Sequence, residues 1–229
     1  MKILKKLNGL RKITRTLGLN PMIYKLVYGN NSYEEKFDSF FSSKIFPNNI
    51  VYDIGANIGH YAIIYSKLVG ELGKVVAFEP SVKNFNLLKD HCKTAQYKNI
   101  VNVNAGLGAT VSKLFLAQGE DEIGATSIMT QKEIGVGNWI DVLPIDEVVG
   151  EYGIPNAIKI DVEGFELEVL EGGSLTLGNP LVKVVGIEIH SEILNKRGID
   201  NCHERIEQIL KNHGYKIHYP DFSHIIGYR

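Results

Sequence analysis

The sequence predicts an α/β protein built on a mostly parallel sheet with helices on both of its faces. Short apolar runs alternate along the chain with longer amphipathic segments, the pattern of alternating strands and helices. The length of 229 residues, 44% of them hydrophobic and 22% charged, suits one globular domain with a short appendage. A core of this size needs no disulfide or metal to fold.

The predicted body starts near residue 46 and extends to residue 229, and its elements follow from apolar spacing and turn residues. Five strands are predicted, at residues 50–54, 74–78, 100–104, 157–160 and 182–189. The intervening helices are predicted at residues 61–69, 83–94, 146–152, 165–170 and 201–212. Two short apolar segments at 215–219 and 224–228, separated by Pro220 and Asp221, predict an antiparallel pair that closes the domain.

An excursion interrupts the alternation after the third strand. Residues 113–117 predict a hairpin-like excursion, and residues 139–142 predict a short strand. The segment between them, 118–138, is long, polar and rich in glycine, so it predicts a loop that could act as a lid.

Residues 1–45 form a predicted helical extension that differs from the body in charge. Residues 1–29 hold seven Lys and Arg and no acid, which leaves 18 basic against 26 acidic residues in the rest of the chain. Apolar residues recur at helical spacing between the lysines. The preferred interpretation packs this amphipathic helix on the body or on a second subunit of a homodimer; the alternative is a peripheral membrane anchor.

Composition also bears on partners and location. The acidic body argues against nucleic acid as the main ligand. No uncharged stretch exceeds 14 residues, so no transmembrane span is predicted, and the start lacks the apolar run of a signal peptide. Cys92 and Cys202 are expected to be reduced and structural. We therefore expect a cytoplasmic protein.

A glycine turn follows the first predicted strand, where the sequence reads VYDIGANIGHY. Gly55 and Gly59 permit a tight turn and close approach of a ligand to the backbone, and Asp53 offers a carboxylate acceptor there. The pattern D-x-G-x-N-x-G lacks the glycine trio G-x-G-x-x-G that seats a dinucleotide pyrophosphate on a helix. A nucleotide-like ligand is expected, and an NAD-dependent dehydrogenase is disfavoured.

Glu79 ends the second predicted strand and is followed by Pro80. An acid in this position can accept both hydroxyls of a ribose, whereas taken alone it could cap a helix. In register with the glycine turn, it predicts a nucleoside site.

Acids also follow the fourth predicted strand. Asp161 and Glu163 flank its end and Gly164 permits the next turn. Two such carboxylates would repel each other unless a cation, a substrate amine or a proton lay between them, which indicates a site. The alternative makes Asp161 a helix cap and Glu163 a solvated side chain. Three later acids are interpreted as a solvated helix face: Glu166, Glu168 and Glu171.

The fifth predicted strand ends with Glu188 and His190, which alternate onto one face. His190 could take a proton from a hydroxyl, since histidine titrates near working pH. Asp161, Glu188 and His190 could instead hold Mg²⁺ or Mn²⁺, and the base is the preferred interpretation. The other histidines are interpreted as having no role, except that His60 could contact a ligand at the glycine turn.

These features, in this order, resemble the class I S-adenosylmethionine-dependent methyltransferases. DIGANIGHY, VVAFEP, IKIDVEGFELEVLEG and GIEIH look specifically like the FkbM family over about residues 51–190. The resemblance implies a Rossmann-like, seven-stranded, mostly parallel sheet of order 3-2-1-4-5-7-6 with strand seven antiparallel. It also implies O-methylation of a hydroxyl on a sugar, glycan or secondary metabolite.

The resemblance further implies S-adenosyl-L-methionine as cofactor. Residues of the first turn would line its methionine end, Glu79 would take its ribose hydroxyls, and the residues after the third strand would border its adenine. The implied cofactor residues are Asp53, Gly55, Ala56, Asn57, Gly59, Glu79, Pro80, Asn104, Ala105 and Asp161. The candidate catalytic residues are Asp161, Glu163, Glu188 and His190, with His190 or Asp161 deprotonating the acceptor. The alternative is a non-catalytic, nucleoside-binding regulatory protein of the same fold.

Overall fold

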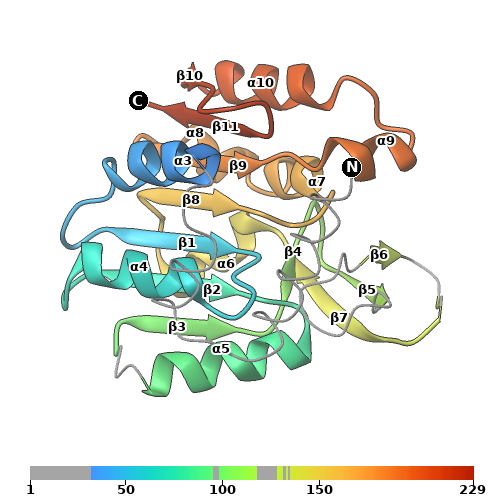
Figure 1. Ribbon diagram of the computed structural model, residues 1–229, viewed down its shortest axis with the longest axis horizontal. Helices are drawn as coiled ribbons and strands as arrows, with labels where there is room; N and C mark the ends of the chain where they lie inside the picture. The colour runs from blue at the N-terminus through green and yellow to red at the C-terminus, as the bar shows by residue number, and fades with distance from the viewer. Residues whose placement is uncertain (1–31, 95–97, 118–127, 131–132, 134) are drawn as a thin grey trace.

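The central sheet of the computed structural model has seven strands in the order β3-β2-β1-β8-β9-β11-β10 (Figure 1). The structure describes residues 32–94, 98–117, 128–130, 133 and 135–229. The strands are β1 (Ile50–Ile54), β2 (Lys74–Phe78), β3 (Ile100–Val103), β8 (Ala157–Ile160), β9 (Val184–Glu188), β10 (Lys216–His218) and β11 (His224–Tyr228). β11 runs antiparallel to both of its neighbours. The predicted fold class and order 3-2-1-4-5-7-6 are confirmed.

Helices cover both faces of this sheet because successive strand residues point to opposite sides. Val51 and Val75 pack into one apolar cluster, whereas Tyr52 and Val76 belong to the other. The first cluster lies under α3 (Ser32–Ser42), α4 (His60–Val69) and α5 (Val82–Thr94). The second lies under α6 (Ile145–Tyr152), α7 (Glu166–Glu171), α8 (Ser174–Gly178) and α10 (Cys202–Asn212). The short helix α9 (Ser191–Lys196) follows β9.

A second, four-stranded sheet has the order β4-β7-β5-β6. It consists of β4 (Gly106–Leu107), β5 (Ser112–Ala117), β6 (Ile128–Thr130) and β7 (Gly137–Leu143). The predicted loop at 118–138 is therefore wrong in part, because it contains β6 and the start of β7. β5 supplies hydrogen-bonding partners to both, and such pairing leaves no local signal in a polar segment. Residues 118–127, the core of the expected lid, lie outside the described residues.

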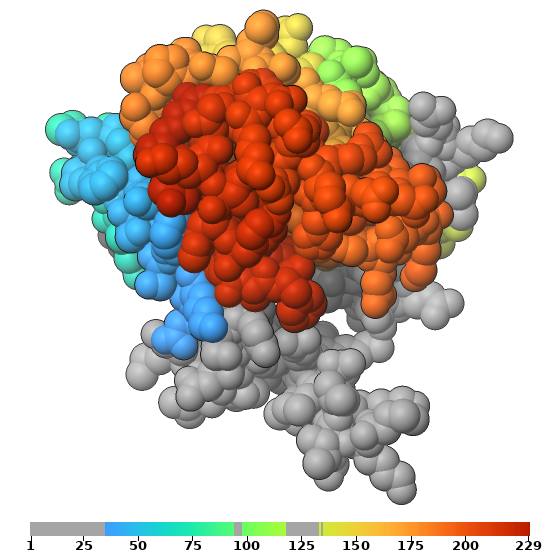
Figure 2. All heavy atoms as spheres, turned by 90° about the horizontal axis from the view of Figure 1, so that it is seen from above, coloured from blue at the N-terminus to red at the C-terminus, as the bar shows by residue number. Residues whose placement is uncertain are grey.

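The segment before β1 packs on the sheet through α3. Phe37 and Phe41 are buried against Gly186, where a Cβ would lie 2.7 Å from each ring. Phe40 stacks on His218 at 4.1 Å, and Figure 2 shows α3 beside the C-terminal segment. The predicted boundary between residues 45 and 46 stays a prediction. The amphipathic leader falls in residues 1–31, outside the described part.

In the described part of the chain, no helix is long and apolar enough to span a bilayer. The predicted strand and helix boundaries agree with the structure to within about two residues, and two short helices, α8 and α9, were not predicted.

Candidate active site

The parallel strands all end at one edge of the sheet. From β1 the strand order proceeds outward through β2 and β3, and from β8 it proceeds in the opposite direction to β9. Ligands of such sheets bind at the point between β1 and β8 where the order reverses. The turn after β1 adopts positive φ angles at Gly55 (81°), Asn57 (50°) and Gly59 (91°). The backbone N–H of Gly55 donates to the carbonyl of Phe78 at 3.0 Å. A Cβ on Gly55 would lie 1.8 Å from the carbonyl oxygen of Asp161. Only glycine lets these two turns meet so closely.

Glu79 ties the ends of β1, β2 and β3 together. Its side chain is 5% exposed, and its two oxygens accept the N–H groups of Asn57 at 2.8 Å and Ser81 at 2.9 Å. The Asn104 amide donates to the carbonyls of Glu79 at 2.8 Å and Pro80 at 3.1 Å. Burial raises the pKa of Glu79 to about 7, although these donors oppose the shift. Each carboxylate oxygen has a further lone pair for a hydroxyl.

Two predicted ligand contacts carry buried polar atoms without a hydrogen-bonding partner in the described residues. These are both carboxylate oxygens of Asp53 and the amide oxygen of Asn57. Burial raises the pKa of Asp53 to about 6, against the opposing charge of Lys159. Buried acceptors of this kind call for a donor, and the ammonium and hydroxyl groups of a nucleoside amino acid are donors. The residues of the glycine turn therefore fit such a cofactor.

Lys159 was missed by sequence reasoning. It lies between the part of the site at the ends of β1–β3, called here the β1–β3 half, and the part at the ends of β8 and β9, called the β8–β9 half. It is 3% exposed, and its Nζ lies 3.1 Å from Oδ2 of Asp161, 3.9 Å from Oδ1 of Asp53 and 4.6 Å from the ring centre of Tyr61. Burial favours a neutral Asp161, but Lys159 and His190 outweigh it and hold the pKa of Asp161 below its usual value. A lysine inside the apolar strand AIKI, two residues before Asp161, was the available signal.

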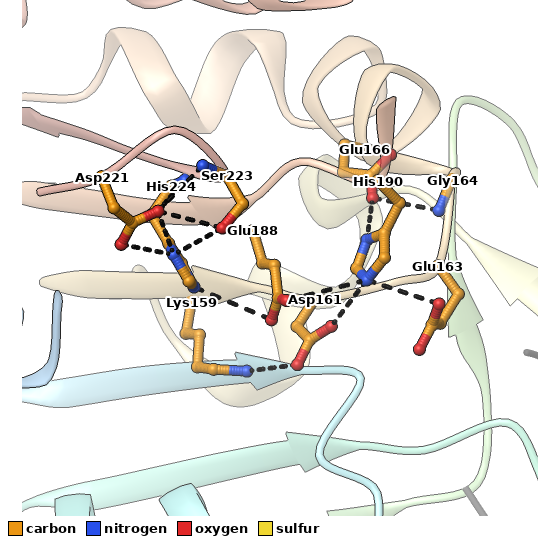
Figure 3. Close-up of polar contacts among 10 residues, drawn as sticks. All are labelled: Lys159, Asp161, Glu163, Gly164, Glu166, Glu188, His190, Asp221, Ser223 and His224. Atoms are coloured by element: carbon orange, nitrogen blue, oxygen red, sulfur yellow. Dashed lines mark hydrogen bonds and ion pairs between the residues drawn. The ribbon is translucent and has the colours of Figure 1, made fainter. Parts of the chain in front are cut away.

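His190 stands among carboxylates at the end of β9 (Figure 3). Its Nε2 lies 3.4 Å from Glu163, 3.8 Å from Asp161 and 4.0 Å from Glu188, while its Nδ1 lies 2.7 Å from Glu166. Burial disfavours the imidazolium, but the hydrogen bond to Glu166 and the charges of Glu163 and Asp161 outweigh it and raise the pKa of His190 to about 9. All four predicted catalytic residues are thus brought together.

The predicted solvated face of α7 is wrong for Glu166, which is 0% exposed. Its Oε1 accepts the N–H of Gly164 at 3.0 Å and the hydrogen bond of His190. Glu163 (φ 51°) and Gly164 (φ 92°) turn the chain so that the helix starts with its first side chain facing inward. Glu168 pairs with Arg197 and Glu171 is exposed. No local signal distinguishes Glu166 from the other two acids, since the periodicity of a six-residue helix does not say which side faces the protein.

His224 is a second residue that sequence reasoning missed. It is 7% exposed, its Nε2 lies 3.8 Å from Oε2 of Glu188, and Asp221 contacts its Nδ1 at 2.9 Å. Because β11 is antiparallel, its first residue pairs with Glu188, the last residue of β9. Figure 3 shows Glu188 between the two imidazoles. No local pattern predicts this, since His224 begins its strand.

The structure also bears on the alternative metal set. Asp161, Glu163 and His190 each offer one donor atom within 4.8 Å of the others, so the possible metal set contains Glu163 in place of the expected Glu188.

Two further predicted contacts lie away from His190. Ala105 is buried beside Asn104 at the end of β3, several strands from β9 in the sheet order. Burial and Lys159 lower the pKa of His60.

The sheet order with its reversed strand, the glycine turn after β1 and the acids after β2 and β8 define the class I fold of S-adenosylmethionine-dependent methyltransferases. Residues 53–217 match the Methyltransferase FkbM domain, and the chain belongs to this family. The resemblance stated from the motifs is thereby confirmed.

Known proteins similar to this chain agree with that placement. The hexuronic acid methyltransferase AglP of Haloferax volcanii is 31% identical over 152 residues, which are 64% of this chain and 58% of AglP. This chain thus matches less than two thirds of that relative.

Two solved structures share the fold. FkbM from Methylobacillus flagellatus KT superposes with a TM-score of 0.55 at 16% identity, covering 90% of this chain and 60% of that one. Fibrillarin from Aeropyrum pernix, in complex with natively bound S-adenosyl-L-methionine, gives 0.55 at 12% identity, covering 86% and 75%.

Proposed function

We propose that the protein is an S-adenosylmethionine-dependent O-methyltransferase that acts on a hydroxyl of a sugar, glycan or secondary metabolite. The observation that carries this proposal is the contact of three strand ends. The Asn57 N–H reaches Glu79 at 2.8 Å, and Gly55 lies against the Asp161 carbonyl. A nucleoside bound at the first of these contacts would thus lie beside a group of acids and a histidine. Membership of the FkbM family supports the chemistry.

The residues of the β1–β3 half would hold the cofactor. Asp53 and Asn57 have buried oxygens that accept no hydrogen bond from the described residues and would face its amino-acid end, and Glu79 has lone pairs for its ribose hydroxyls. Asn104 and Ala105 would border its adenine. When bound, S-adenosylmethionine supplies an electrophilic methyl group on a cationic sulfonium. The carboxylates at this edge favour a cation there.

The β8–β9 half would receive the acceptor. Asp161 stays ionised beside Lys159 and can accept the hydrogen bond of the reacting hydroxyl. The proton leaves to Asp161 or to the neutral form of His190, and the protein otherwise aligns the hydroxyl and excludes water. Glu163 and Glu188, both partly exposed, can accept hydrogen bonds from further hydroxyls of a sugar.

A hydroxyl is favoured over a carboxylate as the acceptor. A hexuronic acid, the substrate class in the name of AglP, carries both. Here three carboxylates, of Asp161, Glu163 and Glu188, surround Nε2 of His190. Their negative charges would repel an anionic acceptor. The same oxygens accept hydrogen bonds from hydroxyls.

Tritiated methyl transfer tests the proposal. The protein is incubated with methyl-labelled S-adenosylmethionine and with methyl β-D-glucoside, methyl β-D-glucuronide or fractions of a cell extract. Ether-linked label, stable to mild base, is expected, whereas label released by base would indicate a methyl ester. Asp161→Asn and His190→Ala should lower turnover strongly, and the exposed Asp141→Asn should not. Full turnover by the first two variants would refute the assigned roles.

Calorimetry separates the alternatives. S-adenosylmethionine and its demethylated product are expected to bind and NAD is not. Binding without transfer to any acceptor would favour the non-catalytic regulatory protein, and tight binding of NAD alone would favour a dehydrogenase.

Transfer is expected without a divalent cation, because Lys159 already supplies a positive charge 3.1 Å from Asp161. Treatment with EDTA should therefore leave the rate unchanged. A loss restored by Mg²⁺ would replace the base by a cation at Asp161, Glu163 and His190.

The proposal also covers the basic leader, residues 1–29, and its binding partner. A cytoplasmic protein that binds no nucleic acid is expected, with residues 1–29 either contacting the body or a second subunit, or lying on an anionic membrane surface. Co-sedimentation with phosphatidylserine vesicles, with and without residues 1–29, distinguishes these: equal binding by both forms would dispose of the anchor.

A further inference from the structure

Glu166 is the most deeply buried acid on the β8–β9 side of the site that the proposed mechanism leaves unused. It is the first residue of α7 and 0% exposed, and its Oε1 accepts two hydrogen bonds, from Gly164 and from His190. The turn that places it packs closely on α9, because a Cβ on Gly164 would lie 2.5 Å from the side chain of Ile193. This packing and the two hydrogen bonds hold Glu166 beside the end of β9.

The two ring nitrogens of His190 consequently face different partners (Figure 3). Nδ1 donates to Oε1 of Glu166 over 2.7 Å, which leaves Nε2 toward Glu163 at 3.4 Å and Asp161 at 3.8 Å. A carboxylate accepts hydrogen bonds and donates none, so it fixes which nitrogen carries the inward proton. Rotation of the ring by half a turn would break this bond and turn Nε2 away from the acceptor side.

The turn by itself does not require an acid at this place. The Gly164 N–H needs one acceptor, and a glutamine amide oxygen would provide it without burying a carboxylate. Moreover, Oε2 of Glu166 is buried without a hydrogen-bonding partner among the described residues, which costs stability. The contact with His190 is the one that a carboxylate serves best.

We propose that Glu166 is a positioning residue for methyl transfer: it holds His190 through Nδ1 so that Nε2 faces the acceptor beside Asp161 and Glu163. This role rests on the proposed function, because it acts through His190. Because Glu166 is 0% exposed, it would itself touch neither cofactor nor acceptor.

A double-mutant cycle tests this role. Glu166→Ala is expected to lower kcat roughly tenfold or more, with little change in KM for S-adenosylmethionine. In a His190→Ala background, the same substitution should have no further effect. Glu166→Gln should recover only part of the lost rate, since its amide oxygen can accept both hydrogen bonds but its NH2 group, unlike a carboxylate, can also donate. Glu171→Gln, on the exposed side of α7, is the matched control and should keep the full rate.

Nitrogen-15 NMR of histidine-labelled protein provides a measurement that needs no acceptor. A hydrogen-bonded Nδ1 proton of His190, assigned by its loss in His190→Ala, is expected in the wild type and in Glu166→Gln but not in Glu166→Ala. Its absence from the wild type would overturn the proposal. So would an equal loss of kcat from Glu166→Ala in both backgrounds, since that indicates a structural role. A wild type that transfers no methyl group but shows the resonance would refute the proposed function, and with it the role in methyl transfer, while confirming the Glu166–His190 contact itself.

Discussion

Replacement of Gly55 by alanine probes the contact on which the whole site depends. Gly55 has a φ of +81°, and the added Cβ would lie 1.8 Å from the Asp161 carbonyl oxygen. An ordinary carbon–oxygen contact is about 3.3 Å, so one of the two turns must move by about 1.5 Å. Both are held by hydrogen bonds of 3.0 Å, from Gly55 to Phe78 and from Asp161 to Ile54. The movement therefore loosens the ends of β1, β2 and β8 together.

Two effects lower the free energy of unfolding of Gly55→Ala. A left-handed backbone costs an alanine about 1–2 kcal/mol, and overpacking against a buried backbone adds about 1–3 kcal/mol. Gly55→Ala should thus lower the free energy of unfolding by about 2–5 kcal/mol. Gly214→Ala is the matched control, because Gly214, two residues after the end of α10, has a φ of +82° and an added Cβ would meet no atom within 4 Å. Gly214→Ala should show only the loss that comes from the left-handed backbone.

Urea unfolding followed by circular dichroism measures the free energy of unfolding of both variants, and thermal unfolding measures their Tm. In a chain of 229 residues, the excess loss at Gly55 corresponds to a Tm lower by about 2–12 °C than that of Gly214→Ala. Calorimetry should also show weaker binding of S-adenosylmethionine by Gly55→Ala alone. Equal stability of the two variants would refute the close approach of the two turns.

Three further predictions follow from buried groups. Lys159→Met removes the cation 3.1 Å from Asp161 and should lower the free energy of unfolding by about 3 kcal/mol. Lys113→Met, at an exposed ion pair, should change it by less than about 0.5 kcal/mol. Similar losses for the two variants in urea unfolding would contradict this prediction. Burial raises the pKa of Glu79 from 4.5 to about 7, so the folded state holds a proton that the unfolded chain has released between these values. Wild-type stability should therefore fall as pH rises through this range, and Glu79→Gln should show a shallower fall; parallel pH curves would speak against the shift. Burial also raises the pKa of Cys92 to about 11, so iodoacetamide should modify it in urea but not in native buffer, as peptide mass mapping can check.

The strands and the cofactor edge were predictable because their signals are local. Apolar runs such as 74–78 and 157–160 mark strands that a parallel sheet buries on both faces. Gly55 and Glu79 follow such runs directly, and the ends of parallel strands must meet at one edge. Their proximity therefore follows from the fold class alone, before any coordinates are known.

The acid–histidine half of the site was predictable only in part. Asp161, Glu163, Glu188 and His190 follow strands and were found. Glu166 looked like a surface acid, because the periodicity of a six-residue helix does not say which side faces the protein. In the second sheet, the segments at 113–117 and 139–142 were predicted, but β6 was missed for a related reason, since it gains its hydrogen bonds from β5 rather than from its own neighbours in sequence.

The sequence by itself determined the fold class, the order of the elements and the family motifs at the strand ends, because residue spacing within a strand or a turn is enough to specify them. Only the tertiary structure decided the partners of His190, the place of Lys159 between Asp53 and Asp161, and the arrival of His224 beside Glu188. These depend on how a turn closes and on the antiparallel direction of β11. They are set by packing between segments that lie far apart in the chain.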